Sequence, residues 1–388
     1  MKAKQLFCAS AVLFAFFIQG FCDIVGISSE YAREAFGWSH TMAGFLPSMV
    51  FVWFLFVSIP VGIKMNKWGR KNTVLIGMAV TVAGMLVPLV GSAWACLVGY
   101  AALGIGNTVL QVSQNALVRN VFTDEKLLTS SLTAGQVVKA VSSFCGPFLM
   151  LFAVNVLGGG DKASWYLVFP VLGALTLLSA LWLWLSPIER EPAEESNVSV
   201  GKTLSLLGDK AILPLFLGIF FAVAIDVGTN FVSSKVMIDR FGWDVTEAGV
   251  APQVYFICRT VGAFLGVFVM TRVSSVTYFR WNIVACIAVI LALALCPLGT
   301  SATLALIGAV GFLCSCVFPT IYSAAVQQAP DKANLISGLM ITAVAGGGAA
   351  TPLIGWATDS FGSITAGVCV LLLCAGYLTY CAFLCKNK

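Results

Sequence analysis

Four charged residues interrupt long apolar stretches of the sequence: Asp23, Lys139, Asp226 and Arg259. A charge at the centre of a membrane helix costs about 2.5–3.5 kcal/mol, so each of these residues requires a partner or a function. The pattern predicts either proton-coupling acids that face a central cavity or two structural ion pairs. The first is favoured because buried ion pairs stabilise proteins poorly compared with apolar packing. Whether Asp23 or Asp226 would carry the proton stays open.

Carboxamide side chains form a second polar set. Asn107, Gln111 and Asn115 recur every four residues, so they share one face of a helix. Carboxamides offer donors and acceptors together, which the hydroxyl groups of a sugar require. The alternative is interhelical hydrogen bonding, worth about 0.6 kcal/mol per contact. Together with polar residues of other spans, the predicted substrate-binding set is Asn107, Gln111, Asn115, Gln136, Lys139, Asp226, Asn230 and Arg259.

The elements that position these residues are membrane helices. The chain of 388 residues is 59% hydrophobic and 10% charged, with a mean hydropathy of +0.95, whereas soluble domains carry about 25% charged residues. Continuous apolar runs of this length fit helices that cross a core of about 30 Å and exclude a β-barrel, whose strands alternate. The sequence predicts an all-α protein with twelve transmembrane helices, at 5–28, 41–63, 72–91, 93–118, 130–154, 164–186, 211–237, 246–270, 277–298, 301–326, 334–358 and 363–384.

A repeated segment indicates an internal duplication. "FGWSHTMAGFLPSMVF" (36–51) and "FGWDVTEAGVAPQVYF" (241–256) share eight of sixteen positions at an offset of 205. Parallel repeats of this kind recur in transporters. The polar stretch from Ser186 to Lys210 is typical of a linker between two halves. We therefore predict two pseudo-symmetric six-helix bundles around a central cavity, with boundaries at 1–186 (N-terminal bundle), 187–210 (cytoplasmic linker) and 211–388 (C-terminal bundle).

Basic residues predict the orientation of the chain. With both termini in the cytoplasm, sixteen Lys and Arg fall in cytoplasmic segments, and only Arg33, Lys162 and Arg240 fall in outer loops. The positive-inside rule favours this arrangement, in a bacterial-type cytoplasmic (inner) membrane. The net charge of +5 is then an insertion signal and does not indicate a nucleic-acid partner.

Catalytic motifs do not emerge from the sequence. His40 is the only histidine and is predicted to lie in a solvated outer turn, and the thirteen cysteines lack metal-site spacing. Neither a nucleotide-binding loop nor a Ser/His/Asp set is apparent. We therefore expect a monomeric protein that is not an enzyme and holds no metal or cofactor.

The loop after the second span carries a family signature. "GIKMNKWGRK" (62–71) resembles the major facilitator superfamily motif Gly-x-x-x-Asp-(Arg/Lys)-x-Gly-(Arg/Lys)-(Arg/Lys). The resemblance implies a latch between the two halves on the cytoplasmic face. Asn66 replaces the acidic residue, so the latch is expected to be weaker. The residues concerned are Gly62, Asn66, Lys67, Gly69, Arg70 and Lys71.

Three further stretches narrow the resemblance: "GNTVLQVSQNALV" (106–118), "VFPTIYSAAV" (317–326) and "GGGAATPLIGWATD" (346–359). They resemble the fucose–galactose–glucose:proton symporter family, typified by the fucose permease. The family pattern implies that Asp23 handles the proton and that Asn115 and Gln136 bind sugar. Gln111 stands where the family has a proton-carrying Glu, and Lys139 replaces an Asn, so the coupling role falls to Asp23 or Asp226.

These observations predict a secondary active importer of a monosaccharide, driven by a proton through alternating access. If Lys139 and Arg259 bind a carboxylate, the substrate is instead a sugar acid or another organic anion. Efflux of lipophilic compounds is less favoured because the predicted cavity is rich in carboxamides. A membrane enzyme or a receptor is the alternative from another class, and counterflow in vesicles separates both from a transporter.

Overall fold

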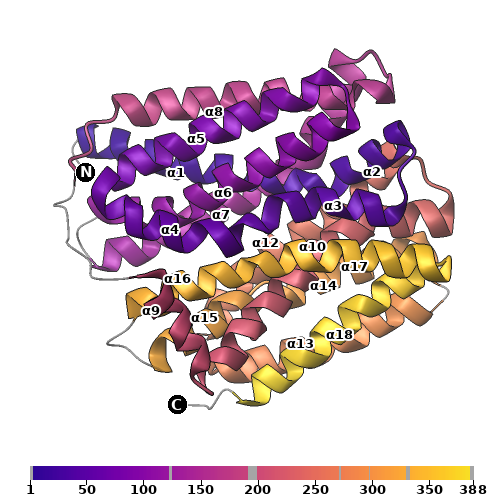
Figure 1. Cartoon of the computed structure of the whole chain (residues 1–388). Helices are drawn as coiled ribbons and strands as arrows, with labels where there is room; N and C mark the ends of the chain where they lie inside the picture. Colours follow the sequence, from indigo (N-terminus) through magenta and orange to yellow (C-terminus); the bar gives the residue numbers. More distant parts are fainter. Residues whose placement is uncertain are drawn as a thin grey trace. The chain divides into compact units, whose positions relative to one another are not determined.

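The computed structural model describes residues 3–121, 125–190, 199–270, 272–296, 298–328 and 333–384 (Figure 1). All secondary-structure elements within these ranges are helices. Twelve helical stretches are long and apolar enough to cross a membrane, which confirms the predicted number of spans. They are Lys4–Phe36, His40–Met65, Arg70–Val90, Ala93–Val118, Val137–Leu157, Lys162–Leu185, Ile212–Phe241, Val245–Met270, Ser275–Leu295, Thr300–Tyr322, Gly338–Phe361 and Ile364–Leu384.

Several spans are built from more than one helical element. The first six comprise α1 (Ala3–Gln19), the 3₁₀ turn η1 (Gly20–Ile24), α2 (Val25–Phe36), α3 (His40–Phe51), α4 (Trp53–Trp68), α5 (Arg70–Leu86), η2 (Val87–Val90), α6 (Ala93–Val121), α7 (Glu125–Phe152), η3 (Ala153–Leu157), η4 (Lys162–Leu167) and α8 (Val168–Leu185). After the short α9 (Val200–Leu204) and η5 (Ser205–Gly208) come α10 (Ile212–Phe241), α11 (Val245–Ala248), α12 (Val250–Met270), α13 (Ser275–Leu295), α14 (Thr300–Cys314), α15 (Val317–Gln328), α16 (Ala333–Thr342), η7 (Ala343–Ala345), α17 (Gly346–Phe361) and α18 (Ile364–Leu384).

The first span is longer than the sequence predicts. It continues past residue 28 to Phe36, although Ser28, Ser29 and Glu30 are polar. These three side chains are almost completely buried, and the Ser29 hydroxyl donates to the Gly26 carbonyl oxygen at 2.7 Å. Because the polar groups find partners inside the protein, their hydrophilicity does not end the helix.

Residue contacts divide the chain into two units. Unit 1 comprises Met1–Ile24 and Trp53–Thr203, and unit 2 comprises Val25–Val52 and Leu204–Lys388. The domain boundaries predicted from the repeat follow chain order and stay a prediction. The contact units differ from them in one respect, because α2 and α3 group with the C-terminal half of the chain. Both α2 and α3 pack on α10 or α17, which accounts for this grouping.

Within unit 1, α5 packs against α6 and α8, and α1 packs against α6, α7 and α8. Close approach at two points depends on glycine. A Cβ on Gly20 would lie 2.6 Å from the Lys139 carbonyl oxygen, so η1 sits directly on the backbone of α7. A Cβ on Gly84 would lie 2.8 Å from the Leu103 backbone nitrogen, which brings α5 against α6. Small residues at such crossings are typical of membrane helices.

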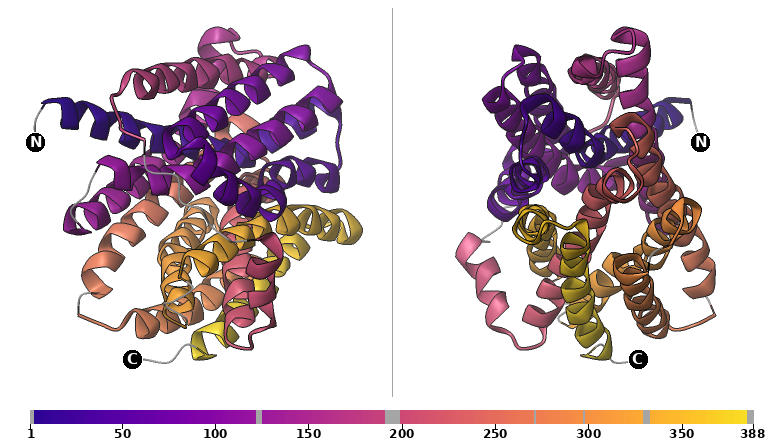
Figure 2. Two further views of the ribbon diagram at one scale, coloured as in Figure 1. Left: turned by 60° about the vertical axis from the view of Figure 1, so that its left-hand side comes forward. Right: turned by 90° about the vertical axis from the view of Figure 1, so that its right-hand side faces the viewer.

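Within unit 2, α17 lies alongside both α3 and α10 (Figure 1). Gly362 ends α17 with a φ of 61°, which a residue with a Cβ rarely adopts, and the chain then returns as α18. The views in Figure 2 show α17 and α18 as a pair at the C-terminal end of the chain. The core of this unit includes the long helix α10, which also contacts α12, α14, α15 and α18.

Candidate functional site

The first acidic group lies where the first span is wound as a 3₁₀ turn. Asp23 belongs to η1, between α1 and α2, and its Oδ2 accepts a hydrogen bond from the Ser143 hydroxyl of α7 at 2.6 Å. Ser143 Oγ also lies 3.1 Å from the carbonyl oxygen of Lys139, one helical turn earlier. The Asp23 and Lys139 side chains are both half-buried. Unit 1 therefore presents a carboxylate and an ammonium group from two adjacent elements in the interior of the membrane spans.

The carboxamides of α6 differ in their surroundings. Asn107 is 4% exposed, and neither atom of its amide group has a nitrogen or oxygen hydrogen-bond partner among the described residues, although the Cys22 thiol lies beside it. Gln111 and Asn115 are half-buried, and Asn115 Nδ2 donates to the Gln111 carbonyl oxygen of its own helix at 3.3 Å. A buried amide without a partner carries a desolvation penalty that a hydrogen-bonding ligand would relieve. The side chain of Gln136, the fourth predicted amide, lies outside the described residues.

Gln114 lies outside the predicted substrate-binding set and is fully buried on α6. Its Nε2 donates to the Ala15 carbonyl oxygen of α1 at 2.8 Å. This hydrogen bond links α6 to α1 and engages the amide nitrogen of Gln114. The four-residue spacing of Asn107, Gln111 and Asn115 excludes Gln114 from their stripe, so the sequence carried no signal for it.

The second acidic group forms an ion pair in unit 2. Asp226 Oδ2 of α10 lies 2.7 Å from Arg259 Nη2 of α12, and the two side chains are 25% and 32% exposed, respectively. The hydroxyl of Tyr255, one turn before Arg259, donates to the other carboxylate oxygen, Oδ1. Charged groups that stay partly exposed inside membrane spans face a water-filled space or partner groups rather than lipid. Asn230, one turn after Asp226, is 4% exposed.

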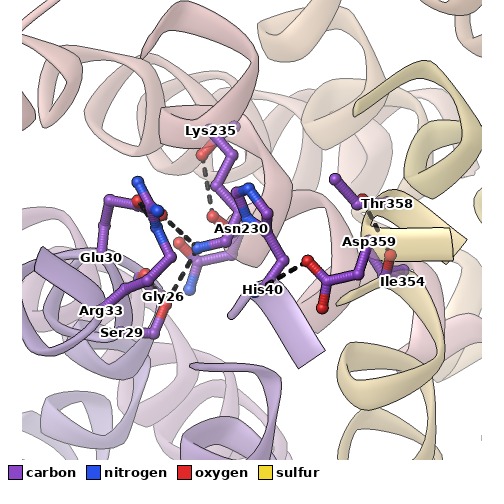
Figure 3. Close-up of polar contacts among 11 residues, drawn as sticks. Gly26, Ser29, Glu30, Arg33, His40, Asn230, Lys235, Ile354, Thr358 and Asp359 are labelled. Atoms are coloured by element: carbon purple, nitrogen blue, oxygen red, sulfur yellow. Dashed lines mark hydrogen bonds and ion pairs between the residues drawn. The ribbon is translucent and has the colours of Figure 1, made fainter. Parts of the chain in front are cut away.

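The structure thus brings Asp226 and Arg259 together, and it places Asp23 beside α7. It also shows two charged residues that the predicted set omits. Glu30 of α2 and Lys235 of α10 are each almost fully buried, and they pair with one another (Figure 3). A weak signal was present in the sequence, because Glu30 and Lys235 are separated by 205 residues, the offset of the repeat.

The prediction that His40 lies in a solvated turn is wrong. His40 begins α3 and is half-buried, and its ring nitrogen Nδ1 is buried. The residue lies between Asn230 and Asp359 (Figure 3), and its backbone N–H donates to Asp359 Oδ1 at 3.1 Å. The hydrophobicity pattern could not indicate this burial because it depends on the packing of α3 on α17.

The predicted latch residues bind the end of the sixth span and the start of the linker. Lys71 Nζ donates to the carbonyl oxygens of Trp184 and Ser186, at 2.9 and 2.7 Å. Arg190 Nη2 donates in turn to the Lys67 carbonyl oxygen at 2.5 Å. All of these groups belong to unit 1.

The other predicted latch residues lie in α4, at the start of α5 or in the turn between these two helices. Gly69 precedes α5 with a φ of 86°, a conformation that favours glycine. Arg70 Nη1 donates to Asn120 Oδ1 of α6 at 2.7 Å, and Gly62 lies within α4. The side chain of Asn66 lies outside the described residues. A latch between the two halves stays a prediction, since these contacts organise one end of unit 1.

The geometry described so far defines an all-helical membrane protein that holds charged and amide groups inside its spans. Among the described residues, no cluster of three or more His, Cys, Asp or Glu could hold a metal ion. The sequence model of the Major Facilitator Superfamily matches residues 7–352. The chain belongs to the major facilitator superfamily.

Relatives match nearly the whole chain. The glucose/galactose transporter of Brucella abortus biovar 1 (strain 9-941) is 24% identical over 397 residues, which cover 96% of this chain and 93% of the relative. The crystal structure of the Escherichia coli fucose:proton symporter FucP superposes with a TM-score of 0.71 at 19% identity and covers 98% of each chain. The nucleoside transporter NupG gives a TM-score of 0.77 at 15% identity, again over 98% of each chain. The two structures establish a shared fold.

Proposed function

We propose that this protein is a secondary active transporter that imports a monosaccharide together with a proton by alternating access. The observation that carries the proposal is that carboxamide side chains of α6 and an acidic residue of the adjoining turn lie inside the membrane spans. Half-buried and buried carboxamides of α6 supply donors and acceptors for hydroxyl groups, and Asp23 lies on the adjoining turn of the first span. The Brucella abortus relative, named a glucose/galactose transporter, and the fold shared with a fucose:proton symporter support the same substrate class.

The proposed roles follow from the surroundings of each group. Asn107, Gln111, Asn115 and Gln136 bind sugar hydroxyls, and Asp23 carries the coupling proton. Asp226 and Arg259 neutralise one another at 2.7 Å, so the pair carries no net charge. Pairing of Arg259 with Asp226 makes Arg259 a weaker candidate for binding the carboxylate of a sugar acid. We further propose a monomer in a bacterial-type cytoplasmic (inner) membrane with both termini cytoplasmic.

Uptake into proteoliposomes tests the proposal. With one proton per sugar, an imposed gradient of one pH unit supplies about 1.36 kcal/mol, enough for roughly tenfold accumulation. We expect glucose, galactose or fucose to accumulate when the interior is alkaline and to leak out when a protonophore is added. Accumulation that ignores the pH gradient would overturn proton coupling, and a lack of counterflow with all three sugars would overturn sugar transport.

A substitution of Lys139 distinguishes the sugar proposal from the sugar-acid alternative. The half-buried ammonium group of Lys139 is the observation that favours the sugar acid. We expect Lys139→Asn to keep counterflow of neutral sugar within about fivefold of the original protein, because an amide still donates to hydroxyl groups. If the substrate is an anion, the same change removes the cation that binds it, at a cost of about 1.5–3 kcal/mol, or at least tenfold in rate at low substrate concentration. Parallel counterflow assays with galactose and galacturonate measure both quantities.

A further inference from the structure

The most completely buried charges of the described chain form one cluster between α2 and α10. Lys235 Nζ lies 2.5 Å from Glu30 Oε2, and each side chain is 1% exposed. The ammonium group also lies 3.4 Å from the Ser29 hydroxyl and 4.0 Å from the centre of the Phe231 ring. Arg33, which is 29% exposed, donates to the second carboxylate oxygen of Glu30 (Figure 3). None of the proposed sugar or proton contacts uses this cluster.

Two features bring α2 close enough to α10 for this pairing. A Cβ on Gly26 would overlap the Asn230 side chain, so the helices cross at a glycine. The Tyr31 hydroxyl lies 3.2 Å from Thr246 Oγ1 of α11, the short helix that follows α10 and contacts it. The ion pair is therefore set in a tight interface that excludes water.

A second contact fixes α3 on α17 beside this cluster. Asp359 accepts hydrogen bonds from the backbone N–H groups of His40 and Thr41, at 3.1 and 2.7 Å, and caps the start of α3. Further along, a Cβ on Gly44 would lie 2.5 Å from the Thr351 carbonyl oxygen, and Ser48 donates to the Gly348 carbonyl oxygen. The α3 and α17 backbones touch through small residues, as membrane helices do in stable pairs.

The segment that makes these contacts is joined at both ends to helices of the other unit. Residues 25–52 group with unit 2, although the chain before them (α1 and η1) and after them (α4) belongs to unit 1. Each transition falls at an irregularity: the 3₁₀ turn η1 precedes α2, and a turn at Val52 separates α3 from α4. In the proposed orientation, α2, the start of α3 and the end of α10 are the outer ends of their spans.

We propose that the Glu30–Lys235 ion pair is a reversible lock that closes the outer side of the transport path. The pair forms when the outer ends of the first two spans dock on α10 and α17, and it separates when they release. The proposal rests on the proposed transport function, and its test requires no substrate.

The chemistry of the pair suits a contact that must open. A buried ion pair contributes little net stability compared with apolar packing, because both charges lose their hydration when it forms. When the interface opens, water solvates both charges again, so neither the closed nor the open state is strongly favoured. Glu30 and Lys235 also stand at the repeat offset of 205. The duplicated spans thus carry opposite charges at equivalent positions, which meet where the spans meet.

Hydrogen–deuterium exchange of the intact protein in lipid nanodiscs tests the lock. We expect Glu30→Gln and Lys235→Met each to raise exchange at least about fivefold in residues 25–52 and 346–361, because one buried charge is left without its partner. Residues 70–118 of unit 1 should exchange as in the unaltered protein. A rise of equal size in residues 70–118 would indicate general destabilisation and would overturn the lock.

Two further variants keep the result interpretable. The double variant Glu30→Gln/Lys235→Met has neither buried charge of the pair, and we expect its exchange to return to within about twofold of the unaltered protein. Arg33→Gln is the matched control, because it removes a partly exposed partner of Glu30 and leaves Lys235 in place. Additive effects in the double variant, or an Arg33→Gln effect as large as that of Lys235→Met, would overturn the proposal. Failure of sugar uptake in proteoliposomes would overturn the proposed function and leave these exchange results unaffected.

Discussion

Replacing Asp23 by asparagine is expected to abolish uphill sugar accumulation while sugar exchange continues. The amide that replaces the carboxylate cannot carry a proton, so a gradient of one pH unit, which supports roughly tenfold accumulation at one proton per sugar, should leave the sugar ratio near one. The asparagine side chain retains an oxygen that accepts the hydrogen bond of the Ser143 hydroxyl, so the turn of the first span should keep its contact with α7. Uptake under an imposed gradient and counterflow at equal pH, measured on one preparation, give the two readouts.

Ser143→Ala provides the matched control for this prediction. It removes the donor at 2.6 Å and leaves a carboxylate that can still accept a proton, so accumulation under the imposed gradient should persist. If Asp23→Asn still accumulates sugar to tenfold, Asp23 does not carry the coupled proton. The same measurement on Asp226→Asn would then decide whether the acid of unit 2 does so.

The sequence predicted the helical class and the number of spans because both depend on apolar runs longer than about 20 residues. It also selected Asp226 and Arg259, since each interrupts such a run, and the structure places them 2.7 Å apart. Tyr255, which completes this contact, gave no comparable signal, because an aromatic residue in a membrane helix is common.

Glu30 was missed for a different reason. It lies in a polar stretch that was predicted to follow the first span, and its burial arises from the packing of α2 on α3 and α10. Hydropathy reports the average hydrophobicity of a segment. The partner of a single charge depends instead on tertiary packing, here between two residues that are 205 positions apart in the sequence. The repeat offset could have suggested the pairing, but only by comparing residue types at equivalent positions outside the sixteen-residue match.

The glycine run at the start of α17 provides the second large expected effect. We expect Gly346→Ala to lower the thermal unfolding midpoint of the purified protein by roughly 1–4 °C, or to prevent its folding, because overpacking at this position costs about 1–3 kcal/mol or more. A Cβ at this position would overlap the Phe220 carbonyl oxygen of α10. The obstructing atom belongs to a helix backbone, so no side-chain rotation can relieve the clash.

Gly376→Ala on α18 is the matched control, because nothing lies within 4 Å of the position of its Cβ. Alanine is a better helix former than glycine by about 0.5–1 kcal/mol, so this variant should unfold at the same temperature or slightly higher. Equal midpoints for the two variants would contradict the close contact of α17 with α10.

Because the same Gly→Ala substitution is expected to have opposite effects at the two positions, a run of glycines in the sequence indicates a close helix contact only where the structure shows one. Gly346 and Gly347 face α10, whereas Gly348 faces α3, so three consecutive small residues allow one helix to approach two others.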